Sequence, residues 1–261
     1  FSDGTLNCEE LIALAEKAGL SCISVVDHDT VDGVTRAQEA GAQRQIEVVP
    51  GVELTAEHEN AEVHILGYLI DHADAGFLAR LQTLRANRRD RIYKITDKLK
   101  AEMGVELKPE SVFAQACADR TVGRLHVARA LVKEGIAHSI YDAFYRFIGD
   151  KSPGYVAGFK LAPQEAIALI RSVGGVAVLA HPYTVSRDEL IPEFVSMGLG
   201  GLEVYYLEHS QGMVNFYRDL AKKYKLVMTG RSDFHGEAKP NVSLGSIKIP
   251  YELVEKLKEA K

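Results

Sequence analysis

Short runs of apolar and β-branched residues recur along the chain, and each is bounded by glycine, proline or charged residues. Such runs predict β-strands. They lie at residues 21–26, 46–49, 63–70, 175–180, 201–205 and 225–228. Between several of them, apolar residues fall at helical spacing, as in 8–18, 162–173 and 208–223. This alternation of strands and helices predicts an α/β fold with a mainly parallel sheet.

The pattern changes in the middle of the chain, where helical spacing replaces the strand pattern. A long helical stretch around 78–103 is followed by shorter stretches near 109–118, 124–134 and 139–148. We therefore expect a small helical domain at residues 73–153, inserted between the two parts of the α/β unit at 1–72 and 154–261. The sequence has no internal repeat and no low-complexity segment.

Histidine and acidic residues stand at or just after the ends of most of these strands. The residues of metal-ligand type are Asp3, His28, Glu53, His64, His181, Asp233 and His235. His64 is the exception, because it lies near the start of its strand. When a parallel sheet closes into a barrel, the loops after its strands gather at one face. Asp233 and His235 are two residues apart, so an extended backbone points both to the same side. We therefore expect these side chains to converge.

The donor types indicate which ions such a cluster could hold. Imidazole and carboxylate groups without a thiolate suit Mn²⁺, Zn²⁺ or Fe²⁺ and are poor for a dedicated Ca²⁺ site. Seven protein donors exceed what one first-row ion accepts, so two or three divalent ions are expected, with Glu53 as the best candidate for a bridging carboxylate. Clustered ions can activate a water and stabilise the oxygens of a phosphoryl group.

Composition and charge narrow the picture further. The chain has 261 residues, of which 46% are hydrophobic and 26% charged, as in an ordinary folded protein. No apolar run approaches the roughly 18 residues of a membrane helix. A formal net charge of −5 argues against bulk attraction to nucleic acid or an anionic membrane. Cys8, Cys22 and Cys117 are odd in number, which favours reduced thiols in a cytoplasmic protein.

Phosphate affinity would then have to come from local cations. Arg85, Arg88, Arg89 and Arg91 lie three and four residues apart on a predicted helix. A guanidinium can hold a phosphate through two parallel hydrogen bonds. The same run could equally be a solvated helix face. Asp27 and Asp29 flank His28 and could orient its imidazole, or Asp29 could cap the next helix.

Six segments together resemble the successive motifs of the PHP (polymerase and histidinol phosphatase) family, in their usual order. They are residues 1–4, 26–29, 51–53, 63–68, 180–182 and 230–236. Within the family, 123–128 and 151–156 resemble the branch that hydrolyses nucleoside 3',5'-bisphosphates and short RNAs. The resemblance implies a distorted (β/α)7-type PHP barrel with an inserted small helical domain. It also implies phosphate contacts from Arg124, His126 and Lys151, to which we add Arg88 and Arg91.

The resemblance further implies a reaction and a division of roles. A metal-activated water would hydrolyse a phosphomonoester of a small nucleotide, with Glu53, His181 and Asp233 as the catalytic residues. Asp3, His28 and His235 would hold one ion, and Glu53, His64, His181 and Asp233 the others. Mn²⁺ is the expected metal, with Zn²⁺ or Fe²⁺ as alternatives. The expected partner is a small phosphorylated nucleotide or a short oligonucleotide, with no membrane and no obligate protein partner.

One departure from the family pattern keeps other functions open. Family members carry a His-x-His pair, which supplies two metal ligands, a few residues before the Ser-Asp-Gly that here occupies 2–4. The sequence starts at Phe1, just inside that motif. The alternatives are a 5'-3' exonuclease on short RNA or DNA, a histidinol-phosphate phosphatase, and a non-catalytic metal-binding regulatory module.

Overall fold

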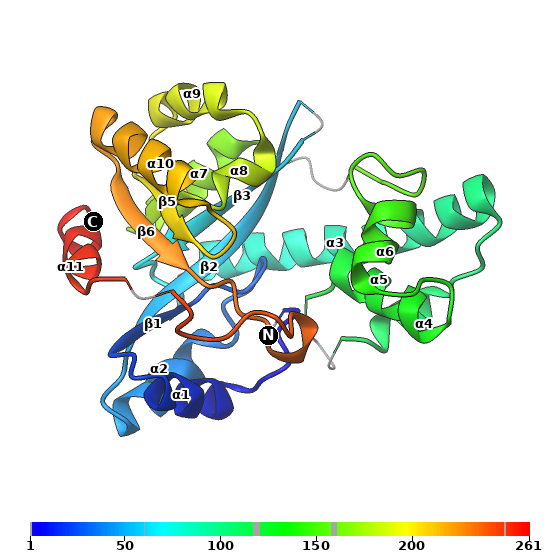
Figure 1. Ribbon diagram of the computed structural model, residues 1–261, viewed down its shortest axis with the longest axis horizontal. Helices are drawn as coiled ribbons and strands as arrows, with labels where there is room; N and C mark the ends of the chain where they lie inside the picture. Colours follow the sequence, from blue (N-terminus) through cyan, green and yellow to red (C-terminus); the bar gives the residue numbers. More distant parts are fainter. Residues whose placement is uncertain (1, 60, 117–120, 158–160, 248) are drawn as a thin grey trace.

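A computed structural model describes residues 2–59, 61–116, 121–157, 161–247 and 249–261 (Figure 1). Its centre is a six-stranded sheet that curls into a half-barrel, with the strands side by side in sequence order. The strands are β1 (Cys22–Val25), β2 (Glu47–His58), β3 (Ala61–Tyr68), β4 (Val176–Leu179), β5 (Gly201–Tyr206) and β6 (Val227–Arg231). Strands were predicted at all six places, and the mixed α/β class is confirmed. The expected end of the second strand at Val49 is wrong, because β2 continues to His58 and Glu53 lies inside it.

The sheet is mixed because β3 runs antiparallel to both of its neighbours. The pairs β1–β2, β4–β5 and β5–β6 are parallel, as expected. β2 and β3 are joined by only two residues, which leaves no room for the crossover that a parallel pair needs. The reversal explains the position of His64: the start of β3 lies at the same edge as the ends of the parallel strands, and His64 pairs with Thr55 near the end of β2.

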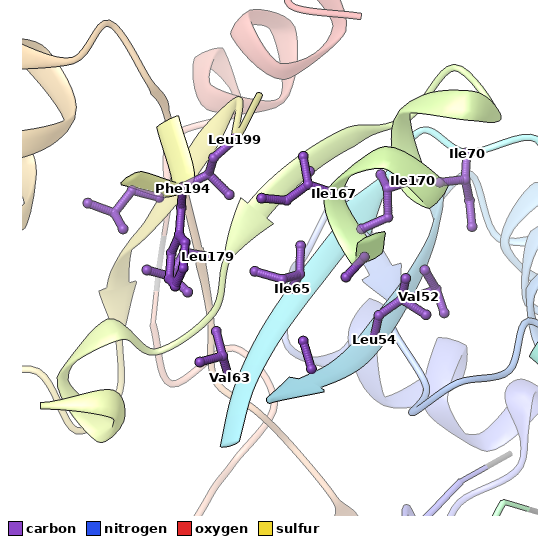
Figure 2. Packing of buried hydrophobic residues seen from close by; sticks show 14 of the residues in the cluster. Val52, Leu54, Val63, Ile65, Ile70, Ile167, Ile170, Leu179, Phe194 and Leu199 are labelled. Carbon is purple, nitrogen blue, oxygen red and sulfur yellow. The ribbon is translucent and has the colours of Figure 1, made fainter. Parts of the chain in front are cut away.

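Helices and short helical turns surround the sheet, and apolar side chains are buried on both of its faces. They are α1 (Cys8–Lys17), α2 (Val34–Gln43), α7 (Pro163–Ser172), α8 (Pro182–Val185), α9 (Ile191–Ser196), α10 (Gln211–Lys223) and α11 (Glu252–Glu259), with the short turns η2 (Asp188–Leu190) and η3 (Gly236–Ala238). α7 packs on β2, β3 and β4, where Ile167 and Ile170 lie over Val52 and Ile65 (Figure 2). Among the described residues, every helix is too short or too polar to span a bilayer.

A group of helices projects to one side of the sheet, between β3 and α7 in the chain (Figure 1). They are α3 (Ala75–Met103), α4 (Pro109–Phe113), α5 (Arg124–Lys133), α6 (Ile140–Ala143) and η1 (Phe144–Ile148). The first part of α3 packs with the sheet core through Phe77 and Leu84, and its later part with a separate core through Ile95 and Leu99. α3 therefore links the two cores.

The far boundary of this helical group lies near residue 157. Residues 154–156, where the α/β unit was expected to resume, form no strand. Val156 packs against the separate helical core, whereas Leu161 belongs to the sheet core. The predicted helix at 109–118 is shorter than expected, since α4 ends at Phe113, and residues 117–118 lie outside the described part.

β1 and β6 stand at the two ends of the strand order in the described part of the chain, and a cavity of about 480 Å³ lies between them. Its walls include β1, β6 and Leu257 of α11, and it reaches the side chains of Asp3, His28 and Glu53. The cavity therefore connects the open side of the half-barrel with the predicted ligands.

Candidate metal centre

Three of the predicted ligands point one donor atom each at a common position. The Nδ1 atom of His64 lies 2.8 Å from Oε1 of Glu53 and 3.2 Å from Nε2 of His181. The Nε2 atom of His181 lies 3.5 Å from the same Glu53 oxygen. Tetrahedral ligands of one first-row ion stand about 3.3 Å apart, given metal–ligand distances of about 2.0–2.1 Å. The spacing of these donor atoms fits one divalent ion.

Each of these three residues reaches the site from a different strand. Glu53 lies in β2, His64 in the antiparallel β3, and His181 directly after β4. The backbone oxygen of His64 accepts a hydrogen bond from the amide of Ala180, which places His181 beside it. His181 has a positive φ of 25°, a conformation that is rare for a residue with a Cβ atom. The chain turns sharply there and aims the imidazole at the cluster.

His28 extends the cluster toward the amino-terminal segment. It follows β1 and forms an isolated bridge with Glu53, and its ring centre lies 5.0 Å from that of His64. His28, Glu53 and His64 offer ligand atoms that all lie within 4.8 Å of one another. The Nδ1 atom of His28 is buried and has no hydrogen-bond partner among the described residues. A buried imidazole nitrogen beside carboxylates fits a metal ligand.

Asp3 and His235 form a second part of the site. The Nε2 atom of His235 lies 3.4 Å from Oδ1 of Asp3. Nδ1 of His235 donates to the backbone oxygen of Asp233 at 2.7 Å, so Nε2 is left as the donor atom for an ion. Burial acts to raise the pKa of Asp3, but His235 and His28 outweigh it and hold that pKa well below its ordinary value. The carboxylate is therefore ionised.

Asp233 lies beside this pair, with its Oδ1 atom 4.0 Å from Nδ1 of His235. Its carboxylate also accepts a hydrogen bond from the hydroxyl of Tyr206 at 3.1 Å and forms ion pairs with Lys239 and Arg231. Its backbone has a φ of 57°, so the extended backbone expected from Asp233 to His235 is wrong, and the chain bends there between β6 and η3. Burial acts to raise the pKa of Asp233, and Arg231 and Lys239 more than offset that effect.

Glu62 orients the imidazole of His64 and was not among the predicted site residues. Its Oε1 atom lies 3.0 Å from Nε2 of His64, on the far side of the ring from Glu53. Burial acts to lower the pKa of His64, but the hydrogen bonds with Glu53 and Glu62 outweigh it and raise the pKa to about 9. Surroundings that attract a proton so strongly also attract a cation. A carboxylate behind a ligating histidine is a common support in metal sites. The signal was the spacing, since 62 and 64 share one face of β3.

Two of the predicted phosphate-binding arginines meet at the same carboxylate. Nη1 of Arg91 and Nη2 of Arg124 each lie 3.1 Å from an oxygen of Glu62. Arg124 also forms an ion pair with Asp150 at 2.5 Å. Two guanidinium groups from the helical group are thus one side chain away from His64. Their role in phosphate binding stays a prediction.

The other predicted phosphate contacts lie in different surroundings. Arg88 is buried, and its Nε atom donates to Asp29 at 2.5 Å and its Nη2 to Thr55 at 2.6 Å. Asp29 therefore forms an ion pair with Arg88. It does not cap the next helix, because the residue before α2 is Gly33. Nδ1 of His126 accepts from the amide of Gly123 at 3.2 Å, and burial lowers the pKa of His126 to about 4. Lys151 is exposed in a turn after η1.

Two further arginines contact the site without having been predicted. Arg129 of α5 donates from Nη2 to the backbone oxygen of Asp3 at 3.1 Å. Arg231, the last residue of β6, donates to both carboxylate oxygens of Glu53, at 2.5 and 3.0 Å. Burial acts to raise the pKa of Glu53, but Arg231 and His28 hold it well below its ordinary value. Arg231 lies inside the 230–236 motif, next to a predicted ligand.

Comparison with known proteins shows which enzymes this chain resembles. The chain is 31% identical over 247 residues to the phosphoribosyl 1,2-cyclic phosphate 1,2-diphosphodiesterase of Eggerthella lenta, which covers 91% of each chain. It is 33% identical over 255 residues to the 5'-3' exoribonuclease Rnm of Escherichia coli, which covers 94% of this chain and 85% of that one. It is 29% identical over 249 residues to the 3',5'-nucleoside bisphosphate phosphatase of Chromobacterium violaceum, with coverage of 94% and 87%.

The fold agrees with these relatives. A crystal structure from Bifidobacterium adolescentis, described as a metal-dependent phosphoesterase, superposes with a TM-score of 0.89 at 30% identity, covering 99% of this chain and 92% of that one. The barrel-like PHP architecture expected from the motifs is therefore confirmed, as is the expectation of a hydrolase that acts on phosphoester bonds. The family model of the PHP domain matches residues 1–148. The chain belongs to the PHP domain family of metal-dependent phosphoesterases.

Proposed function

We propose that this chain hydrolyses a phosphomonoester of a small nucleotide of the nucleoside 3',5'-bisphosphate type and so releases phosphate. The observation that carries the proposal is the continuous contact from the donor triad to two arginines. Glu53, His64 and His181 face one cation position, and Glu62 links the back of His64 to Arg91 and Arg124. A metal position and guanidinium groups lie within one network, which is what hydrolysis of a phosphate ester requires.

The metal would be held by the donor set already described, and Mn²⁺ is the proposed ion, with Zn²⁺ or Fe²⁺ as alternatives. Two or three ions are proposed, held by Asp3, His28, Glu53, His64, His181, Asp233 and His235. When bound, such ions supply a water of lowered pKa and a positive charge for the phosphoryl oxygens. We propose Glu53 as the bridging group.

The residues of this chain would position the reacting groups. Glu62 holds the ring of His64, while Nδ1 of His181 lies 2.7 Å from Oγ1 of Thr184. The amide of His181 also donates to Glu203 at 2.7 Å. The His64 ring is thus held by Glu62, and His181 is held at its ring by Thr184 and at its backbone by Glu203. Arg124 and Arg91 would bind the oxygens of the phosphate that is removed.

The helical group favours a small substrate over a long one. Arg88, Arg124 and Arg129 of this group each contact a residue of the sheet region, namely Asp29, Glu62 and Asp3. These contacts attach the helical group to the sheet region beside the cluster. A substrate held between the two parts would be small, because clefts of this kind bury most of a small ligand. The division into a barrel at 1–72 and 154–261 and an insertion at 73–153 remains part of the proposal, supported by the two separate cores.

A second candidate is 5'-3' removal of nucleotides from short RNA. The identity of 33% to the Escherichia coli exoribonuclease favours it. Both reactions would use the same cations. They differ in whether the attacked phosphorus belongs to a terminal phosphomonoester or to a phosphodiester that joins the next nucleotide. Histidinol phosphate and a ribose 1,2-cyclic phosphate are the remaining substrates to compare.

The experiment is a parallel assay of the purified chain with Mn²⁺. The substrates are a nucleoside 3',5'-bisphosphate, a 5'-labelled short RNA, histidinol phosphate and phosphoribosyl 1,2-cyclic phosphate. We expect phosphate release from the first to be fastest. Glu53→Gln should abolish it, whereas Glu16→Gln, at an exposed ion pair with Arg44, should leave it unchanged. Turnover of another substrate but not of the bisphosphate would overturn the ranking, and no turnover of any would favour the non-catalytic module.

A further inference from the structure

A guanidinium group lies among the carboxylates of the metal centre. Arg231 ends β6, and only 11% of its side chain is exposed. Its Nη1 and Nη2 atoms lie 2.5 and 3.0 Å from the two oxygens of Glu53. Its Nη1 also lies 3.4 Å from Oδ1 of Asp233, and its Nε 3.1 Å from Oε1 of Glu203. One cation thus contacts three carboxylates.

The guanidinium of Arg231 contacts both oxygens of Glu53, but only one of these oxygens also faces the histidines. Oε1 faces Nδ1 of His64 at 2.8 Å and Nε2 of His181 at 3.5 Å. Oε2 faces Nη1 of Arg231 at 2.5 Å. A carboxylate that bridges two divalent ions presents its oxygens in the same way, one to each ion. Here Oε2, the oxygen that faces neither histidine, is taken by the guanidinium, so Glu53 would bridge one ion and Arg231 and not two ions.

Asp233 is the second predicted metal ligand that Arg231 contacts. Its Oδ1 atom faces Arg231, and its other oxygen is held by Tyr206 and Lys239. Glu53 and Asp233 are therefore joined through Arg231. A divalent ion that bound both carboxylates would have to compete with this guanidinium.

We propose that Arg231 takes the place of one divalent cation in this centre. Its guanidinium neutralises Glu53 and Asp233, so the donor set binds one ion fewer than its carboxylates would otherwise hold. The inference rests on the proposed metal centre but not on the identity of the substrate.

The positive charge of Arg231 is permanent, and its neighbours hold it in the centre. An arginine side chain does not lose its proton in proteins, so the charge is present at every working pH. Glu203 is fully buried and needs a counter-charge, which Arg231 provides. Glu203 pairs with Thr229 in the β5–β6 register, and Thr229 and Arg231 point to the same side of β6. The strand geometry therefore directs the arginine into the centre.

The competing explanation is that Arg231 only balances Glu203 and has no bearing on metal binding. The two explanations differ in what happens when the guanidinium is removed. If it replaces an ion, Glu53 and Asp233 become free to share one. If it only balances Glu203, the number of bound ions stays the same.

The test counts metal ions and does not depend on turnover. Native chain, Arg231→Met and Arg231→Lys are equilibrated with Mn²⁺, and the bound metal per chain is measured by mass spectrometry after removal of free ion. We expect Arg231→Met to bind one more ion per chain than native. Arg231→Lys, which keeps the charge, should bind the native number. Arg36→Met serves as the matched control, because Arg36 pairs with Glu9 on the surface.

A second variant keeps the test decisive if Arg231→Met does not fold. Glu203→Gln combined with Arg231→Met removes the buried charge that the arginine balances, but leaves Glu53 and Asp233 in place. It should also gain one ion, and its melting temperature should rise more on addition of Mn²⁺ than that of native chain. Equal or lower metal content in both Met variants would overturn the proposal, whichever substrate the enzyme hydrolyses.

Discussion

The ion pair between Arg88 and Asp29 offers a test of whether Arg88 serves stability or phosphate binding. The two side chains are 7% and 0% exposed, and Nε of Arg88 lies 2.5 Å from Oδ2 of Asp29. Nη2 of the same arginine donates to Thr55 at 2.6 Å, while Thr55 donates its amide to Asp29 at 3.2 Å. These contacts join α3 to β2 next to the metal centre. The perturbation is Arg88→Met, which keeps the apolar stem and removes the charge.

The expected loss follows from the burial of Asp29. Removing one partner of a buried ion pair typically costs about 3–5 kcal/mol, because the other charge is left in a medium of low dielectric constant. We therefore expect Arg88→Met to lower the free energy of unfolding by about 4 kcal/mol. In Asp29→Asn the charge on the other side is removed, and the double variant should lose less than the sum of the two single losses. A coupling energy of about 2 kcal/mol or more is expected for residues in such contact.

Urea unfolding followed by far-ultraviolet circular dichroism measures these energies, since the chain has no tryptophan for fluorescence. Arg36→Met is the control, because its pair with Glu9 is about half exposed and should contribute less than about 1 kcal/mol. The reasoning is refuted if Arg88→Met stays within about 1 kcal/mol of native chain. A weaker affinity for phosphate at unchanged stability would instead assign Arg88 to substrate binding.

Three further changes test the support of the site and the packing of the sheet. Glu62→Gln should weaken Mn²⁺ binding by about 10–100-fold, measured by chelator competition, because the carboxylate behind a ligating histidine is lost. His126→Gln should flatten the pH dependence of the free energy of unfolding. Burial lowers the pKa of His126 from 6.5 to about 4, which corresponds to about 3 kcal/mol of stability. This stability is present above pH 6.5 and is lost as the pH falls toward 4. Gly201→Ala should cost about 1–3 kcal/mol in urea unfolding, since a Cβ atom there would lie 2.7 Å from the side chains of Val178 and Val227. Gly212→Ala in α10, with nothing nearer than 3.8 Å, should cost nothing.

The strands and most helices could be predicted because the apolar pattern is a local signal. The runs at 21–26, 201–205 and 225–228 correspond to β1, β5 and β6 within a few residues. The direction of β3 was not predicted, since apolar spacing does not report which way a strand pairs. The two-residue link after His58 forces the reversal, but it could not be recognised while the strand was expected to end at Val49. The reversal accounts for the unexpected place of His64.

The candidate site was harder to predict where its members act through distant partners. Residues of ligand type could be recognised by their place after a strand, as with His28 and His181. Glu62 could have been found from its spacing to His64 in the same strand. Arg231 has no such mark, because its contact with Glu53 depends on a fold that joins strands far apart in the chain. Arg88 resembled a surface cation in the sequence, and only the fold brings Asp29 to it, 59 positions away. Long-range pairing is not encoded in any short window.

The pairing of the arginines has a consequence for how phosphate would bind. Arg88 is held by Asp29, Arg231 by Glu53, and both Arg91 and Arg124 by Glu62. Each of these cations is already balanced by a carboxylate, so a phosphate dianion that approaches Glu62 meets repulsion as well as attraction. The added positive charge must then come from the divalent ions. Inorganic phosphate should therefore bind at least about tenfold more tightly to the Mn²⁺-loaded chain than to the chelated chain in calorimetry, and equal affinities would show that the arginines alone suffice.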